Sequence, residues 1–120
     1  MLLIPKQGRK DVEGKELEKR IKLCLKAHNL TMKKRNYVCP VAEIDIIAEG
    51  ENGLLVFVEI KERNSKTFGE GRDAIDANKK FRMRSACAYY LKYVVKESRQ
   101  VRFDLMEIYQ GTPSYMENIF

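Results

Sequence analysis

Two short runs of alternating residues, 43–49 and 54–61, flank the segment Gly50-Glu51-Asn52-Gly53 and constrain the fold more than any other feature. Every even-numbered position in both runs is apolar. Because side chains alternate between the two faces of a strand, one face of each run should be buried. These apolar residues are Ile44, Ile46, Ala48, Leu54, Val56, Val58 and Ile60. Turn-forming residues separate the runs, and the pattern therefore predicts an antiparallel hairpin.

The other face of the predicted hairpin is apolar near the turn and ionised at the open end. If the turn centres on Asn52, residues equally far from it lie opposite one another, so Asp45 faces Glu59 and Glu43 faces Lys61. Opposed side chains lie about 5 Å apart at Cβ. At such a separation two carboxylates repel by about 1 kcal/mol in water and about 4 kcal/mol at a surface-like dielectric. A hairpin that only has to be stable rarely contains this pairing, which indicates a functional site.

A divalent cation removes the repulsion between the two acids, since carboxylate oxygens are the preferred ligands of Mg²⁺. We expect Asp45 and Glu59 to hold Mg²⁺ or Mn²⁺, and Lys61 to orient a nucleophile or to stabilise an attacked phosphate. This arrangement suits phosphodiester hydrolysis. The plain alternative is a set of salt bridges on an exposed strand end, Glu43–Lys61 and Glu59–Lys61, each contributing little.

Composition favours a polyanionic partner. The chain has 120 residues, enough for one domain, and its 23 lysines and arginines exceed its 17 acids to give a net charge of +6. Three widely spaced cysteines and a single histidine argue against a disulfide framework and a zinc site. The apolar start is too short for a signal sequence or a membrane span. We therefore expect a cytoplasmic protein with nucleic acid as its partner and no membrane association.

Periodicity predicts the remaining elements. Residues 1–14 are polar and basic and should be loose, which leaves residues 15–120 as a single domain. Helical spacing predicts a helix over 15–29 and a second over 72–96, while 30–39 should form a polar edge strand and 101–108 a closing strand. The tail from Gly111 suits a short strand or coil. The expected buried stripe of the second helix is Ala74, Ala77, Phe81, Ala88, Leu91 and Val95. This element order predicts an α/β class.

Basic residues gather early in the second predicted helix, where Lys79, Lys80, Arg82 and Arg84 form a cluster able to contact phosphates without reading sequence. A solvated helix face is the alternative for each of them. The glycine-containing segment 65–72 should be a loop near the end of the acidic strand, where it could cover a substrate.

Beyond these patterns, the chain resembles the bacterial YraN family of the PD-(D/E)XK nuclease superfamily, which is similar to archaeal Holliday-junction resolvases. The resemblance rests on residues 42–48, residues 56–63, Arg35-Asn36-Tyr37, Phe68-Gly69, Ala74-Ile75, Lys79, Arg82, Arg102-Phe103-Asp104 and Asn118-Ile119-Phe120. It implies a restriction-endonuclease-like αβββαβ fold with a mixed central sheet flanked by helices. Departures include Ala42 where the family has glycine, and Leu17 before Glu18.

The resemblance also implies roles for individual residues. Asp45, Glu59 and Lys61 match the catalytic positions of the superfamily, with Asp45 and Glu59 as metal ligands. A further catalytic and metal-binding acid usually comes from the first helix, where Glu18 matches and Glu16 competes. An ion pair with Lys22 is the alternative for Glu18.

Three functions compete at this stage. The leading one is a Mg²⁺-dependent nuclease acting on DNA, including branched or structured DNA, and by resemblance to resolvases a homodimer. The second is a non-catalytic nucleic-acid-binding module of the same fold. The third is a protein-interaction or regulatory domain, for which binding to DNA would be absent at low salt.

Overall fold

A computed structural model of the protein describes residues 3–63 and 75–120, and the side chains from residue 14 onward within them. The elements are α1 (Leu3–Ala27), β1 (Thr31–Val38), β2 (Glu43–Glu49), the 3₁₀ turn η1 (Glu51–Gly53), β3 (Leu55–Glu62), α3 (Ala77–Tyr90), the π-helical turn η2 (Leu91–Val95), β4 (Val101–Tyr109) and β5 (Thr112–Met116). Three features predicted from the sequence lie outside the described residues. They are residues 72–74 of the second predicted helix, the predicted loop 65–72, and Phe68-Gly69.

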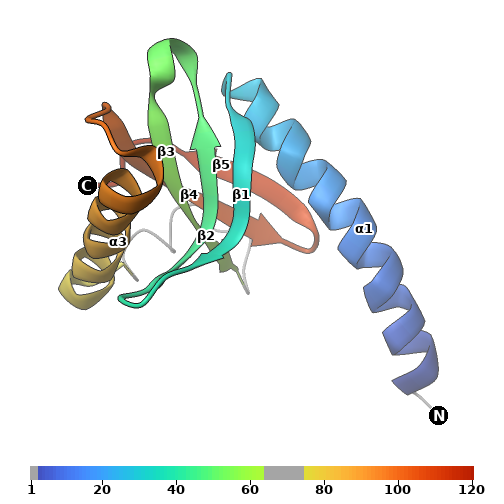
Figure 1. The fold of residues 1–120 in the computed structure, drawn as a ribbon. Helices are drawn as coiled ribbons and strands as arrows, with labels where there is room; N and C mark the ends of the chain where they lie inside the picture. Colours follow the sequence, from blue (N-terminus) through green and yellow to red (C-terminus); the bar gives the residue numbers. More distant parts are fainter. Residues whose placement is uncertain (1–2, 64–74) are drawn as a thin grey trace.

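The five strands form one mixed sheet in the order β1-β2-β3-β4-β5. Neighbouring strands are antiparallel except β3 and β4, which are parallel. A parallel pair needs a crossover connection, and α3 lies within it. Helices α1 and α3 stand on opposite sides of the sheet (Figure 1). The predicted α/β class and mixed sheet flanked by helices are confirmed, and the tail from Gly111 forms the strand β5.

The predicted hairpin and its register are confirmed. Ile46 pairs with Val58 and Ala48 with Val56, as expected for residues equally far from Asn52. Asn52 and Gly53 have φ angles of 58° and 75°. Asparagine and glycine are the residues that adopt positive φ most readily, so the composition of this turn explains why the chain reverses here.

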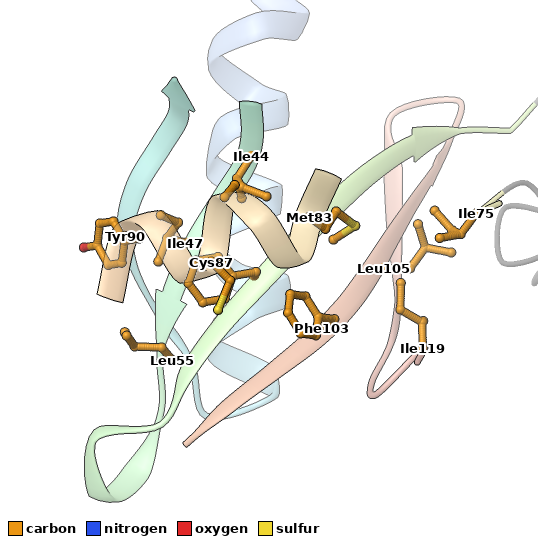
Figure 2. Packing of buried hydrophobic residues seen from close by; sticks show 12 residues of the cluster. Ile44, Ile47, Leu55, Ile75, Met83, Cys87, Tyr90, Phe103, Leu105 and Ile119 are labelled. Atoms are coloured by element: carbon orange, nitrogen blue, oxygen red, sulfur yellow. The ribbon is translucent and has the colours of Figure 1, made fainter. Parts of the chain in front are cut away.

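Apolar side chains on the two faces of the sheet form two separate cores. The α1-side cluster contains Ile21, Leu25, Leu30, Ile46, Ala48, Val56, Val58, Met106 and Ile108. The α3-side cluster contains Ile44, Ile47, Leu55, Phe57, Ile75, Met83, Ala86, Cys87, Tyr90, Phe103, Leu105 and Ile119, most of which are labelled in Figure 2. The predicted strands are therefore buried on both faces near the turn, as strands between two helical layers must be.

Strict alternation fails at one end of β2. Ile44 should share a face with Ile46, but it lies in the α3-side cluster while Ile46 lies in the α1-side cluster. The residue between them, Asp45, marks the point beyond which β2 and β3 no longer pair residue by residue. Here β2 keeps its pairing with β1 but no longer pairs with β3, so its side chains are held on one edge only, and the face changes.

The predicted buried stripe of the second helix is wrong at Ala77, Phe81 and Ala88, which are exposed, whereas Leu91 and Val95 pack against the α3-side cluster; Ala74 lies outside the described residues. Phe81 is 68% exposed, and α3 is buried through Met83, Ala86, Cys87 and Tyr90 instead. Both sets have the spacing of one helix face, so periodicity alone allowed either. The helix also begins later than predicted, at Ala77, because the Asp76 side chain accepts a hydrogen bond of 2.8 Å from the Lys79 N–H and caps it.

Helix α1 begins at Leu3, so the backbone of residues 3–14 is helical where composition predicted a loose segment. Pro5 lies in the first turn, where a missing N–H costs no intrahelical hydrogen bond. The lysine, arginine, glutamine and glutamate of this segment favour helices as readily as they favour solvent. The division of the chain at residue 14 into segment and domain stays a prediction.

Within residues 3–63 and 75–120, the structure contains no helix with the length and apolar character that a membrane crossing requires.

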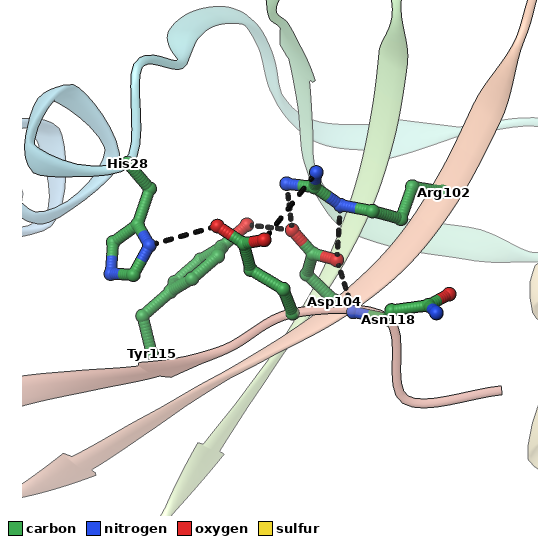
Figure 3. A network of polar contacts seen from close by, with 6 residues as sticks. His28, Arg102, Asp104, Tyr115 and Asn118 are labelled. Atoms are coloured by element: carbon green, nitrogen blue, oxygen red, sulfur yellow. Dashed lines mark hydrogen bonds and ion pairs between the residues drawn. The ribbon is translucent and has the colours of Figure 1, made fainter.

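A buried carboxylate joins the far strands to the end of α1. Asp104 on β4 is fully buried and accepts four hydrogen bonds (Figure 3). Arg102 donates two of 2.9 Å, the Tyr115 hydroxyl donates one of 2.6 Å, and the Asn118 N–H donates one of 2.8 Å. Glu117 extends the network to His28 at 3.0 Å. Every donor is satisfied by a charged acceptor, so this network should stabilise the fold.

We predict that Asp104→Asn destabilises the protein by about 3–5 kcal/mol, because the fully buried carboxylate accepts four hydrogen bonds that an amide cannot all replace. Urea denaturation followed by circular dichroism measures this. Glu117→Gln is the matched control: that side chain is 44% exposed, so its loss should cost less than about 1 kcal/mol. Equal losses in the two variants would show that Asp104 has no special role.

Candidate active site

The two acids of the hairpin meet where pairing between β2 and β3 stops. The last paired residues are Ile46 and Val58. Beyond them, Asp45 Oδ2 accepts a hydrogen bond of 2.8 Å from the Ile60 N–H, so a side chain takes the place of a backbone partner. The carboxyls of Asp45 and Glu59 interact at this point, each from its own strand. The structure thus brings together the two acids that the sequence placed opposite one another.

Glu59 is held in an environment that disfavours its charge. Its side chain is only 12% exposed, and Lys79 Nζ lies 2.7 Å from its Oε2. Burial raises the pKa of Glu59; the Lys79 contact lowers it and the neighbouring Asp45 carboxyl raises it, leaving the pKa above its ordinary value of 4.5. A raised pKa produced by burial and a like charge together is typical of functional sites.

Lys61 does not supply the cation next to Glu59. It is exposed on β3 opposite Glu107 of β4, and among the described residues no ion pair involves it. The ammonium group at the acid pair comes from α3, through Lys79. Lys61 is therefore an exposed side chain two residues beyond Glu59 on the same strand.

Glu18 reaches the acid pair indirectly. Its Oε1 accepts a hydrogen bond of 2.9 Å from Arg35 Nε, and Arg35 Nη1 donates at 3.1 Å to the backbone carbonyl of Asp45. An ion pair between Glu18 and Lys22, the alternative for this acid, is not what the structure contains. The competing Glu16 pairs with Arg20 at 3.1 Å instead. Of the two helix acids, Glu18 is therefore the one connected to β2.

The residues present fit a hydrated Mg²⁺ or Mn²⁺ better than a fully protein-bound ion. Mg²⁺ is commonly held by one or two carboxylates and several waters, which Asp45 and Glu59 can supply. A dication would also relieve the repulsion that raises the pKa of Glu59. In the described part of the chain, no group of three or more acids, histidines and cysteines is close enough to share one ion, and a metal-binding role for Glu18 stays a prediction.

The basic cluster divides into two pairs. Lys79 and Arg82 line a cavity of about 340 Å³ together with Val41, Ala42, Glu43 and Met83. Lys80 and Arg84 lie instead over the ring of Phe120, with Lys80 Nζ 5.6 Å and Arg84 Cζ 5.0 Å from its centroid. Residues three or four apart share a helix face, which explains both pairings. Of these four residues, Lys79 is the one that contacts Glu59 directly.

Sequence reasoning missed the part played by Arg35, which it used only as one piece of a family resemblance. The signal was available, because β1 was predicted as a strand next to the acidic one, and Arg35 pairs with Ile46, the neighbour of Asp45. It also missed the contact between Lys79 and Glu59, which depends on how α3 crosses the sheet.

Most of this chain matches the sequences of known proteins. A sequence model described as "Uncharacterised protein family UPF0102" matches residues 17–108, which include both acids. A UPF0102 protein of Desulfosudis oleivorans is 36% identical over 106 residues, covering 88% of this chain and 85% of the relative. A UPF0102 protein of Moorella thermoacetica is 42% identical over 77 residues, covering 63% of this chain and 62% of the relative.

We predict that the pKa of Glu59 falls in Asp45→Asn and rises in Lys79→Met, because these changes remove a raising and a lowering charge respectively. Carbon-13 NMR titration of the glutamate carboxyls measures both shifts. Since the folded pKa is the higher one, ionised Glu59 costs stability, and this cost develops as the pH rises from 4.5 through the folded value.

Glu51→Gln is the control for this titration, because Glu51 is an exposed acid in η1 at the opposite end of the hairpin. It should leave the pKa of Glu59 unchanged. A Glu59 pKa that is insensitive to Asp45→Asn would contradict the contact between the two carboxyls.

Proposed function

This chain belongs to the uncharacterised protein family UPF0102, the YraN family of restriction-endonuclease-like proteins, and on that premise we propose that it is a divalent-metal-dependent nuclease that hydrolyses phosphodiester bonds in DNA. The observation that carries the proposal is the acid pair. Asp45 and Glu59 interact where the hydrogen-bond ladder between β2 and β3 ends. Burial and the neighbouring Asp45 carboxyl raise the pKa of Glu59. Branched or otherwise structured DNA is the substrate class that the resemblance to resolvases favours.

Asp45 and Glu59 would hold the ion, which supplies Lewis-acid activation of water and charge neutralisation at a phosphate. The Ile60 N–H orients one oxygen of Asp45 through its 2.8 Å hydrogen bond. Lys79, 2.7 Å from Glu59, stabilises the ionised form that a ligand must have. Lys61, exposed on the strand that carries Glu59, is the group available to a phosphate oxygen.

We assign Glu18 a positioning role in this proposal. It holds Arg35 by a hydrogen bond of 2.9 Å, and Arg35 in turn holds the Asp45 carbonyl. This chain of contacts anchors the backbone at the point where β2 and β3 cease to pair. A precisely held ligand needs such support, because a displacement of about 1 Å can cost about 100-fold in rate.

A second candidate function is a nucleic-acid-binding module that does not cut. One observation favours it: the Lys79 ammonium lies 2.7 Å from the Glu59 carboxylate and can balance its charge. Under this alternative the acids could be neutralised without loss of DNA binding, whereas the nuclease requires both of them.

We predict that the protein cleaves DNA in Mg²⁺ or Mn²⁺ but not in EDTA, and that Asp45→Asn and Glu59→Gln abolish cleavage. Lys61→Ala should slow it on the order of 100-fold, since a positioned charged or proton-transferring group contributes on that scale. Linear, supercoiled and four-way-junction DNA are incubated with each variant and analysed on gels. Glu51→Gln is the matched control and should cleave as the wild type does.

Circular dichroism melting of each variant separates loss of chemistry from loss of fold. Cleavage that survives in both Asp45→Asn and Glu59→Gln would overturn the nuclease. DNA binding without cleavage by the wild type, unchanged in those variants, would favour the binding module.

A further inference from the structure

A small cavity lies between the turn that joins β1 to β2 and the first turns of α3. The turn is tightly closed, because the Cys39 N–H donates to the Ala42 carbonyl at 3.0 Å and Cys39 Sγ lies 3.3 Å from the same oxygen. Val41, at the tip, is 50% exposed. The turn thus places Val41, an apolar residue half exposed to solvent, among the residues that line the cavity.

The cavity combines apolar and charged walls. Val41, Ala42 and Met83 supply the apolar lining, and Lys79, Arg82 and Glu43 the charged groups. Its volume of about 340 Å³ lies within the range of small-ligand sites. Lys79 belongs to both the cavity and the acid pair, since its ammonium contacts Glu59 at 2.7 Å. A ligand in the cavity therefore lies next to the proposed reaction centre.

We propose that this cavity receives an unpaired nucleotide of the DNA strand that lies at the acid pair, an inference that rests on the proposed nuclease function.

The charges of the cavity favour such a ligand. Arg82 and Lys79 are complementary to a phosphate, while the carboxylate of Glu43 is an acceptor suited to the exocyclic amino group of a base. Val41 and the partly exposed Ala42 offer an apolar surface to the flat face of that base, as apolar wedges do when they separate stacked bases. A base inside an intact duplex is stacked and paired, so only an unpaired nucleotide can enter.

The first test measures binding without cleavage. Fluorescence anisotropy in EDTA compares a blunt duplex with the same duplex carrying a short unpaired overhang. The wild type should bind the overhang substrate about 10-fold more tightly, and Val41→Asp should remove that preference, since one stacked base contributes on this scale. Arg82→Gln should reduce the steepness of the salt dependence on the overhang substrate by about 0.7 in log–log slope, the value for one phosphate contact to a single strand.

Two variants serve as matched controls. Val38→Asp makes the same chemical change at a residue that is 64% exposed on β1 but does not line the cavity. Arg84→Gln makes the same change as Arg82→Gln at a residue that lies over Phe120. Both controls should keep the wild-type preference for the overhang.

A second measurement locates the nucleotide. With methionine methyl groups labelled by carbon-13, deoxycytidine monophosphate should shift the NMR resonance of Met83, which lines the cavity. Met106 is buried in the α1-side cluster on the other face of the sheet, so its resonance should not move.

The outcomes separate this inference from the nuclease proposal. Equal binding of blunt and overhang substrates, equal effects of Val41→Asp and Val38→Asp, or an unmoved Met83 resonance would overturn the nucleotide subsite even if the protein cleaves DNA. If the preference for the overhang is lost in the cavity variant Val41→Asp but not in the controls, and the protein cleaves no DNA, the subsite is supported and the nuclease proposal is overturned.

Discussion

The hydrogen bond from the Ile60 N–H to the Asp45 carboxylate is the contact on which the arrangement of the site depends. A side chain satisfies a donor that a backbone carbonyl would otherwise satisfy, so the ladder between β2 and β3 can end without an unpaired buried group. Asp45 is thereby held beside Glu59 rather than repelled into solvent. The repulsion that remains is moderated by Lys79 at 2.7 Å from Glu59.

Helix α3 serves two purposes because successive basic residues point in different directions. Lys79 and Arg82 line the cavity, and Lys79 also contacts Glu59, whereas Lys80 and Arg84 cover Phe120, whose ring stacks on Phe103 at 4.7 Å. Cations over an aromatic ring stabilise the packing of that ring. Four basic residues that are close together in the sequence therefore form one pair that lines the cavity and one pair that packs on Phe120.

The sequence predictions succeeded where local chemistry was decisive and failed where two packings were equally periodic. The hairpin register was predictable because Asn52 and Gly53 suit a turn with positive φ and every even position beside it is apolar. The stripe through Phe81 was wrong because Met83, Ala86, Cys87 and Tyr90 have the same helical spacing. Ile44 lies on the other face because, beyond Ile46, β2 no longer pairs with β3 and is held by β1 alone.

By itself the sequence determined that an antiparallel hairpin would carry Asp45 and Glu59 on facing strands, since alternation with period two and a turn at Asn52 leave little choice of register. Only the tertiary structure decided which basic side chain contacts these two acids and which acid of α1 supports them. Lys79 reaches Glu59 because of the way α3 crosses the sheet, and Glu18 reaches Asp45 because Arg35 on the edge strand bridges the two. Such contacts join residues far apart in sequence, and no local pattern specifies them.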